Sequence, residues 1–323
     1  MQTNGFSHAV VFDGKGGATN ISFEQLDENI NSNKLVWVHF DYSTPDTIDW
    51  LTNKSGIDQI AIEALLTKET RPRTTFLNDS ILLALRGINL NPNSTPEDMI
   101  SIRLFINKNI IISTKKRDLL SVRDILEYFK EGIGPKTSAE FLIELTNRLT
   151  IRMEDNINDI EERVSNLEEI SVDSDNSELR AQISEIKRET ISLKKYLSPQ
   201  KEAMYKLYNQ KVSWVSEYEK VQLREITDQL MRYIEELDSI KDKVSVIQEN
   251  ISQRLSEQMN QKMYVLSIIS AIFLPLGFLT GLFGINVGGI PGAESKESFY
   301  IFIMILIAIV GLQLYIFKKK RWL

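Results

Sequence analysis

Two uncharged stretches near the C-terminus constrain this chain more than any other feature of its sequence. Residues 263–283 include no charged side chain over 21 positions, and a second uncharged run follows at 299–317. At about 1.5 Å of helix per residue, a run of the first length crosses a hydrocarbon layer of roughly 30 Å. The sequence therefore predicts a two-helix membrane hairpin, with transmembrane helices at about 263–285 and at 299–317 and an external loop at 286–298.

The charges around the hairpin predict its orientation. Residues 318–323 form a basic tail that begins with Lys318, Lys319, Lys320 and Arg321, and positive charge beside a span marks its cytoplasmic side. The N-terminal residues show no basic region followed by a long apolar run, so we expect no signal peptide. Both termini, and the large body that precedes the hairpin, are then expected in the cytoplasm.

Charge and composition exclude several functions. The formal net charge is −6, yet residues 262–323 carry six Lys or Arg and two Asp or Glu, so residues 1–261 sum to −10. An acidic body argues against nucleic acid as a partner and is compatible with cations. The absence of cysteine excludes disulfides, thiolate metal sites and thiol nucleophiles. No nucleophile–base pair or metal-ligand cluster is visible either, so we expect neither an enzyme nor a bound cofactor.

The first 134 residues have the pattern of an α/β domain. Short β-branched runs predict strands, and longer periodic runs between them predict helices. The expected strands are 8–12, 35–40, 81–90, 99–106 and 110–113, and the expected helices are 23–31, 57–66 and 119–129. Residues 13–17 and 107–109 are expected to form turns. The only two histidines, His8 and His39, lie in expected strands, so we interpret them as surface or packing residues rather than metal ligands.

Residues 135–215 are expected to form an antiparallel helical hairpin. A capping box at Thr137 and Glu140 opens it, and apolar residues from Leu142 to Leu167 recur every three or four positions on one helical face. Ten acidic residues and one basic residue lie between Glu154 and Glu178. This acidic tip is either an ordinary solvated surface or a rim that attracts cations.

Residues 216–285 predict one long stalk helix that continues into the first membrane span. A second capping box, at Ser216 and Glu219, marks its start. Apolar residues then follow a heptad seam: Leu223, Ile226, Leu230, Tyr233, Leu237, Ile240, Val244, Ile247 and Ile251. A seam of this kind packs against other helices. We therefore expect symmetric assembly to cover it.

The same spacing continues into the span as a stripe of mostly small or polar residues. The stripe consists of Asn260, Met263, Ser267, Ser270, Leu274, Gly277 and Gly281. Small residues often line close helix–helix contacts in membranes. Alternatively, several copies could turn this stripe toward a common axis and border a water-filled path, with Met263 and Leu274 as apolar constrictions. The spacing leaves both interpretations open.

The end of the first span resembles a known family. Gly284-Ile285-Asn286 is similar to the Gly-Met-Asn signature of the CorA superfamily of divalent-cation transporters, and Ile285 together with the following VGGIPG is closer to its ZntB branch of zinc transporters. Further segments resemble that branch in the same order along the chain. They are 69–73 (ETRPR), 131–135 (EGIGP), 196–200 (YLSPQ), 280–284 (TGLFG) and 321–323 (RWL).

This resemblance implies a function and an assembly. It implies a CorA-like homopentameric funnel in the bacterial inner membrane, with first spans lining the pore and second spans facing lipid. Gly284, Ile285 and Asn286 would form the selectivity filter, with a ring of Asn286 side chains as outer-sphere ligands of the ion. The expected substrate is Zn²⁺, with Co²⁺, Ni²⁺, Cd²⁺ and Mg²⁺ as other divalent cations. Relatives on the magnesium side carry a threonine at the position of Gly277, so a hydroxyl ring is missing here.

The residues themselves constrain the mechanism. Neither span contains Asp, Glu, His or Lys, so the usual inner-sphere zinc ligands are absent and the ion should remain hydrated. Outside the spans, Glu294 and Glu297 against Lys296 leave one negative charge per chain, which either attracts cations or belongs to a solvated loop. Uptake linked to the proton gradient would need titratable groups elsewhere. The alternatives are a Mg²⁺/Co²⁺ channel of the CorA type and a membrane-anchored coiled-coil scaffold or sensor.

Overall fold

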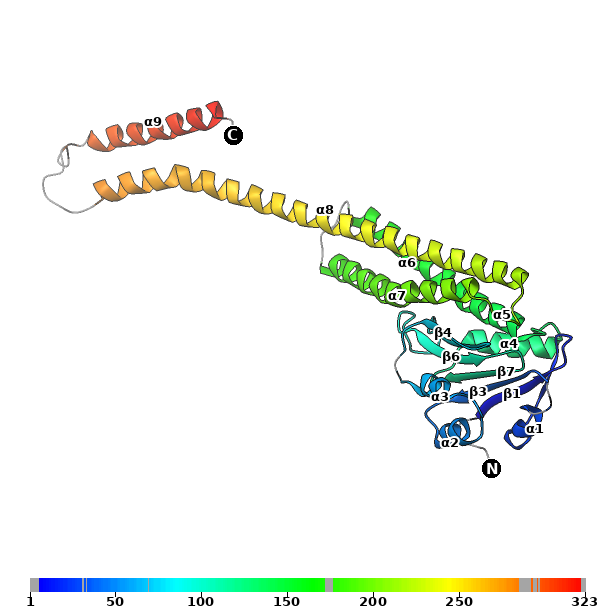
Figure 1. The fold of residues 1–323 in the computed structure, drawn as a ribbon. Coiled ribbons are helices and arrows are strands. Elements are labelled where there is room, and N and C mark those ends of the chain that lie inside the picture. The colour runs from blue at the N-terminus through cyan, green and yellow to red at the C-terminus, as the bar shows by residue number, and fades with distance from the viewer. Residues whose placement is uncertain are drawn as a thin grey trace. The chain divides into compact units, whose positions relative to one another are not determined.

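The computed structural model describes residues 6–30, 32, 34–68, 70–171, 177–284, 292, 295 and 297–320. The chain divides into two compact units, Met1–Gln248 and Glu249–Leu323. The first unit combines a mixed sheet with helices on both of its faces (Figure 1). The second unit contains the end of one long helix and a further helix. Together with the two candidate spans, these elements confirm the predicted fold class of an α/β domain with long helices and a hairpin.

The sheet is organised around one parallel pair of strands. Its order is β2-β1-β3-β7-β6-β5-β4, with β3 and β7 parallel and each other neighbouring pair antiparallel. The strands are β1 (Phe6–Phe12), β2 (Ala18–Asn20), β3 (Val36–Asp41), β4 (Arg73–Leu77), β5 (Ser80–Gly87), β6 (Ile100–Ile106) and β7 (Ile110–Lys115). The five predicted strands are confirmed. The additional strands, β2 and β4, form the two edges, where polar residues are tolerated because one side faces solvent.

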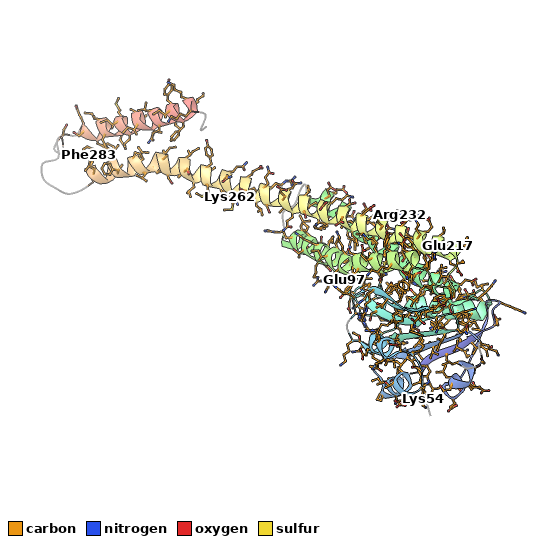
Figure 2. The ribbon with its side chains drawn as sticks, viewed as in Figure 1. Lys54, Glu97, Glu217, Arg232, Lys262 and Phe283 are labelled. Atoms are coloured by element: carbon orange, nitrogen blue, oxygen red, sulfur yellow. The ribbon has the colours of Figure 1, made fainter. Side chains whose placement is uncertain are left out.

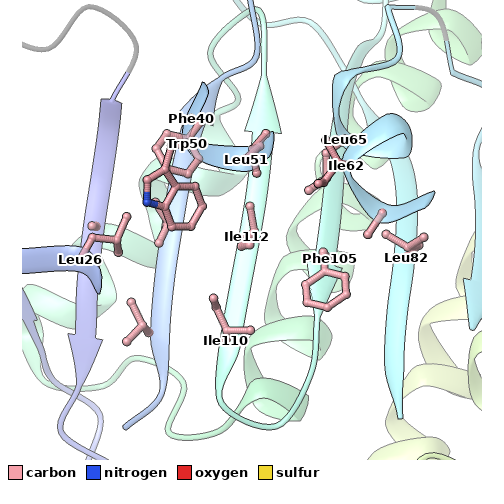
Figure 3. Close-up of a cluster of buried hydrophobic side chains, with 14 of the residues drawn as sticks. Leu26, Phe40, Trp50, Leu51, Ile62, Leu65, Leu82, Phe105, Ile110 and Ile112 are labelled. Atoms are coloured by element: carbon pink, nitrogen blue, oxygen red, sulfur yellow. The ribbon is translucent and has the colours of Figure 1, made fainter. Parts of the chain in front are cut away.

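Each face of the sheet is covered by its own helices. One face packs on α1 (Leu26–Ile30), α2 (Pro45–Asn53) and α3 (Gln59–Leu66), and Figure 3 shows Trp50 beside Phe40 in this core, 5.2 Å apart between ring centroids. The short 3₁₀ helix η1 (Phe23–Gln25) precedes α1. The other face packs on α4 (Leu120–Glu131) and α5 (Ser138–Ile151). Because both faces are covered, β3 and β7 each have five consecutive buried residues and show no alternation between buried and exposed positions.

Short polar side chains fix the two turns that the sequence predicts. The Asp13 carboxylate accepts backbone hydrogen bonds from Lys15 at 2.6 Å and Gly17 at 2.9 Å, between β1 and β2. The Asn107 side chain accepts from the backbone nitrogens of Asn109 at 3.0 Å and Ile110 at 2.9 Å, between β6 and β7. Such contacts replace the hydrogen bonds that strand residues make with each other.

The helical hairpin differs from the prediction in its first arm. The apolar spacing is continuous, but the helix ends at Ile151 and restarts at α6 (Glu154–Ser171) before α7 (Ser177–Asn209). At the break, the Met153 nitrogen donates to the Thr150 carbonyl at 3.0 Å, and Arg152 forms an ion pair with Asp124 of α4 at 2.6 Å. Binding of Arg152 to a neighbouring helix favours a tightened turn that apolar spacing alone does not reveal.

The heptad seam of α8 (Glu217–Phe283) does not depend on another copy of the chain. Its positions from Leu223 to Ile247 are buried in the single chain, where α8 runs beside α6 and α7 (Figure 1). Polar bonds cross the same contacts: Lys243 pairs with Glu161 at 3.0 Å, and the Tyr233 hydroxyl bonds Glu154 at 3.1 Å. The expectation that this seam requires symmetric assembly is therefore wrong, because its own hairpin already covers it.

In the second unit, α8 and α9 (Ser298–Lys319) are joined by an unusual polar contact. Pro275 lies inside α8, and its missing N–H deprives the Ala271 carbonyl of its helical donor. The Gln313 side chain of α9 donates to that same carbonyl oxygen at 3.2 Å. Because lipid offers no replacement donor, Gln313 satisfies the backbone group that the proline leaves without one.

Replacement of Gln313 should weaken the α8–α9 contact only while Pro275 is present. We expect Gln313→Leu to destabilise the full-length protein by about 1 kcal/mol, as for other interhelical hydrogen bonds in membranes. In a Pro275→Ala background, the introduced alanine can supply the helical N–H and the loss should disappear. Unfolding of the four proteins of this cycle in mixed micelles measures both values. An equal loss in both backgrounds would contradict the assignment.

Candidate ion pathway

The candidate pathway depends on the apolar surface of α8 and α9. Both helices are long and apolar enough to cross a membrane, and their most apolar segments are not buried within the chain. Figure 2 marks Lys262 and Phe283, between which α8 carries no charged side chain. Exposed aromatic residues of this unit include Phe273, Phe278 and Tyr300. So much apolar surface requires lipid or protein to cover it.

Within the second unit, α8 has two nearly opposite faces. Within residues 263–283 its partly buried positions recur at helical spacing and are Ile268, Ile272, Pro275, Leu276 and Leu279. The positions predicted to line a pore are exposed throughout: Asn260, Met263, Ser267, Ser270, Leu274, Gly277 and Gly281. Leu274 is 73% exposed. The helical period of 3.6 residues separates the two sets, although Gly277 of the predicted stripe borders the groove between α8 and α9.

The small residues of the stripe are not explained by packing against α9. A Cβ atom added at Gly277 or Gly281 would meet nothing within 4 Å. Gly277 and Thr280 border a groove of about 670 Å³ between α8 and α9, with Leu306 and Val310 on the opposite side. Close helix packing at these glycines would therefore need another copy of the chain.

The polar atoms of the stripe suit a hydrated cation. The Ser267 hydroxyl donates to the Met263 carbonyl at 2.8 Å, so its oxygen remains as an acceptor. Water molecules bound to a cation point their hydrogens outward, so a surface that receives them needs acceptors rather than donors. The serine oxygens and the Asn260 amide carbonyl provide that chemistry without a fixed charge.

The end of α8 lies where the sequence predicts the filter. The Gly284 nitrogen donates to the Thr280 and Gly281 carbonyls at 2.9 and 3.2 Å and closes the last turn. Of the other predicted filter and loop residues, Ile285, Asn286 and Glu294 lie outside the described residues. Glu297 occupies the N-cap position of α9, and its carbonyl accepts from the Ile301 nitrogen at 3.1 Å.

Titratable side chains in the described part of the chain show no arrangement for direct metal ligation. No group of three or more His, Asp or Glu residues there could hold a metal ion. His39 is 1% exposed and its Nδ1 lies 2.7 Å from the Ser113 hydroxyl, and burial holds the pKa of its ring well below 6.5. On the acidic hairpin, Arg163 pairs with Asp159 at 3.1 Å and also with Glu189.

Gln313 is the residue of the hairpin that apolar spacing did not predict. A signal for it exists in the sequence, because it is the one amide in the uncharged run 299–317 and a proline interrupts the other run at position 275. Only the structure joins the two, since their pairing depends on how α9 is aligned along α8.

Known proteins resemble this chain along nearly its whole length. The "Divalent cation transporter CmaX" of Pseudomonas aeruginosa is 36% identical over 99% of this chain and 97% of its own length. The "Zinc transport protein ZntB" of Pectobacterium carotovorum is 34% identical over 100% of this chain and 98% of its own. Both alignments include the α/β part, the long helices and the hairpin. Both identities are higher than a shared fold alone would require.

Solved structures agree with the sequence relatives. The structure of full-length CmaX superposes with a TM-score of 0.86 and covers 98% of both chains. The complete CorA magnesium transporter of Methanocaldococcus jannaschii has a TM-score of 0.80 at 16% identity, covers 98% of this chain and 99% of its own, and shows the same fold. Residues 32–319 match the family described as "CorA-like Mg2+ transporter protein". This chain therefore belongs to the CorA-like family of transporter proteins.

Proposed function

We propose that this chain transports divalent metal cations across the bacterial inner membrane, with Zn²⁺ as the favoured substrate. The observation that carries the proposal is the uncharged stripe of α8, all of whose residues are exposed in the single chain. The preference for zinc is supported by relatives named as zinc transport proteins at 34% identity. A Mg²⁺/Co²⁺ channel is the second candidate, because the family description names Mg²⁺.

One stripe cannot enclose a path, so transport requires several copies of the chain. We propose a homopentamer in which five copies turn Asn260 to Gly281 of α8 toward a common axis. The segment boundaries follow the sequence prediction: residues 1–215 and the first part of 216–285 lie in the cytoplasm, about 263–285 and 299–317 cross the membrane, and 286–298 face outward. The basic tail, 318–323, then lies at the cytoplasmic surface.

The transported ion keeps its water in this proposal. Neither span contains Asp, Glu, His or Lys. The pathway therefore lacks the side chains that usually bind zinc directly and displace its water. Asn286 at the outer mouth would accept hydrogen bonds from the bound waters through its amide oxygen. Neutral acceptors hold such an ion weakly enough to release it. Glu294 and Glu297 would raise the local cation concentration outside.

Any coupling to protons must use groups outside the spans. Zinc uptake driven by the proton gradient would need a residue that binds and releases a proton during each cycle, and the spans contain no ordinary candidate. We therefore assign a coupling role, if the protein has one, to the cytoplasmic part or to the mouths of the pathway.

A scaffold or sensor with a non-conducting hairpin is less well supported. A plain anchor gains nothing from glycines at 277 and 281 whose neighbouring space is open. Small residues serve close packing between membrane helices, and nothing in the described part of the chain packs against either glycine, so an anchor that does not assemble has no use for them.

Flux measurements with purified protein test the proposed substrate and filter. We expect proteoliposomes that hold metal-sensitive dyes to take up zinc, and Asn286→Ala to slow uptake about tenfold or more, because a lost hydrogen bond of about 1.4 kcal/mol has that effect on a rate. Asn53→Ala, the same substitution at an exposed position of α2, is the control. The assay is run with and without a pH gradient. Magnesium flux without zinc flux would favour the Mg²⁺/Co²⁺ channel. If folded protein transported neither ion, the result would favour the scaffold.

Cysteine substitution tests which face of α8 borders water. Because the chain has no cysteine, a single introduced thiol is the only reactive one. We expect Leu274→Cys to react with a membrane-impermeant thiol reagent and lose transport, since this residue lies on the exposed stripe. Leu279→Cys, the same substitution on the partly buried face, should remain unmodified and active. Equal modification of both variants, or modification of Leu279→Cys alone, would contradict the proposed pathway.

A further inference from the structure

The first unit contains a strongly basic pocket that the transport proposal does not use. This basic pocket has a volume of about 530 Å³, within the range of small-molecule sites. Its lining residues are Tyr42, Lys68, Thr70, Arg71, Arg86, Asp98, Ile100, Ser101, Lys116, Arg117, Lys195 and Tyr196. Six of these side chains are basic and one is acidic, in a part of the chain whose overall charge is negative.

The pocket lies at one edge of the sheet, where the parallel pair ends. Asp41 at the end of β3 is paired with Lys115 at the end of β7, and the Tyr42 nitrogen donates to the Lys115 carbonyl at 3.1 Å. The chain then continues into Lys116 and Arg117. Ligands of open α/β sheets commonly bind beyond the carboxyl ends of parallel strands. The strand topology thus places the basic residues where such a sheet has room for a ligand.

Neighbouring elements complete the wall of the pocket. Arg86 of β5 is paired with Ser101 of β6 at the same edge, and α7 supplies Lys195 and Tyr196. Gln200 of α7 binds both backbone groups of Arg86, at 2.7 and 3.1 Å. These contacts fix the position of α7 against the sheet, so the lining comes from a rigid framework.

Two guanidinium groups are held in place by aromatic rings. Arg86 lies over Tyr196 at 4.3 Å and donates to the Met99 and Thr70 carbonyls at 2.7 and 3.0 Å. Arg103, only 1% exposed, lies over Tyr42 at 4.4 Å. Burial lowers the pKa of Arg103, Tyr42 opposes this effect, and the nearby charge of Arg86 adds to it. Cation–π contacts and carbonyls thus hold Arg86 at the wall, and Arg103, which does not line the pocket, adds positive charge beside the lining residue Tyr42.

Several other charges of the pocket are not neutralised by the protein. Arg117 is paired with Asp98, at 3.2 Å for one of its contacts, and this pairing lowers the pKa of that carboxyl. The remaining exposed cations make no ion pair among the residues that the structure describes: Lys68, Arg71, Lys116 and Lys195. Like charges at this density repel one another, which an anionic ligand would relieve.

A buried hydroxyl adds a specific hydrogen-bonding group. Thr70 lines the pocket, is 6% exposed, and its Oγ1 has no hydrogen-bond partner within the described part of the chain. A buried polar atom without a partner costs free energy. An acceptor on a ligand would provide the partner that this hydroxyl lacks.

Two segments that resemble the ZntB branch meet at this pocket. Residues 69–73 contribute Thr70 and Arg71, and residues 196–200 contribute Tyr196 together with Gln200, which holds the Arg86 backbone. Both lie far from the pore-lining stripe in sequence. The proposed transport path therefore does not explain why these segments resemble that branch, whereas a binding site in the first unit would explain it.

We propose that the basic pocket binds a polyphosphate group, either as an inorganic polyphosphate or as part of a nucleoside triphosphate. Arginine and lysine side chains bind phosphate oxygens by charge-assisted hydrogen bonds, and arginine can bind two oxygens at once. A pocket with an excess of five positive charges suits several linked phosphates better than one carboxylate or sulfate. Because a guanidinium group already lies over each of the two tyrosine rings, we assign recognition to the phosphates rather than to a stacked base.

Calorimetric titration of the full-length protein in detergent tests this site without any flux measurement. Sodium triphosphate, ATP, sulfate and citrate are titrated in metal-free buffer at equal ionic strength. We expect triphosphate and ATP to bind, and sulfate and citrate to bind at least tenfold more weakly.

Lys116→Gln and Arg71→Gln should each weaken triphosphate binding about ten- to a hundredfold, as for one charge-assisted hydrogen bond. Both side chains are exposed, so these variants are expected to fold.

The control is Lys54→Gln, the same substitution at the C-terminal end of α2, which should leave binding unchanged. Tighter binding of ATP than of triphosphate, with both sensitive to Lys116→Gln, would support the pocket and identify a nucleotide as the source of the phosphates. Equal binding of citrate and triphosphate would overturn the proposal, because it would indicate charge attraction alone. Absence of binding, or an equal effect of Lys54→Gln, would also overturn it. The transport proposal would survive any of these results, since no step of it uses this pocket.

Discussion

The absence of charged side chains from both spans is the constraint on which the hairpin depends. An uncharged helix can enter lipid because its backbone bonds are satisfied internally, and the one carbonyl that loses its donor to Pro275 receives one from Gln313. The same absence removes every ordinary ligand that could replace a cation's water. Membrane insertion and the proposed passage of a hydrated ion thus rest on one property of the sequence.

The long helix α8 carries a buried apolar seam in one part and an exposed stripe in another, and both follow the same helical spacing. Between Leu223 and Ile247 its apolar seam is buried against the hairpin of the same chain, so this part needs no second copy to cover it. Between Asn260 and Gly281 the residues of the stripe are mostly small or polar, and all of them are exposed in the single chain. Assembly is therefore expected to depend on the membrane segment and on surfaces other than the seam. The family relationship over residues 32–319 includes both parts.

Local sequence patterns made much of this fold predictable. The features that could not be predicted depend on contacts between segments that are far apart in the sequence. Apolar runs and Asx turns predicted five strands and the turns at 13–17 and 107–109. The helix α2 was missed although Pro45 at its start is a recognised signal, because the apolar pattern over its nine residues is short. The break at 152–153 depends on Asp124, and the Gln313 contact depends on the alignment of two helices. The basic pocket draws on residues 42 to 196, so no single stretch indicates it.

Competition by an ion that cannot lose its inner ligands would test the hydrated pathway most directly. Cobalt(III) hexammine resembles a hexaaquo divalent ion in size, but its ammonia ligands do not exchange. If the outer mouth binds a cation through its water shell, the complex should inhibit zinc uptake into proteoliposomes competitively, and Asn286→Ala should weaken that inhibition together with uptake. Zinc uptake that is insensitive to the complex at concentrations far above that of zinc would contradict passage of a hydrated ion.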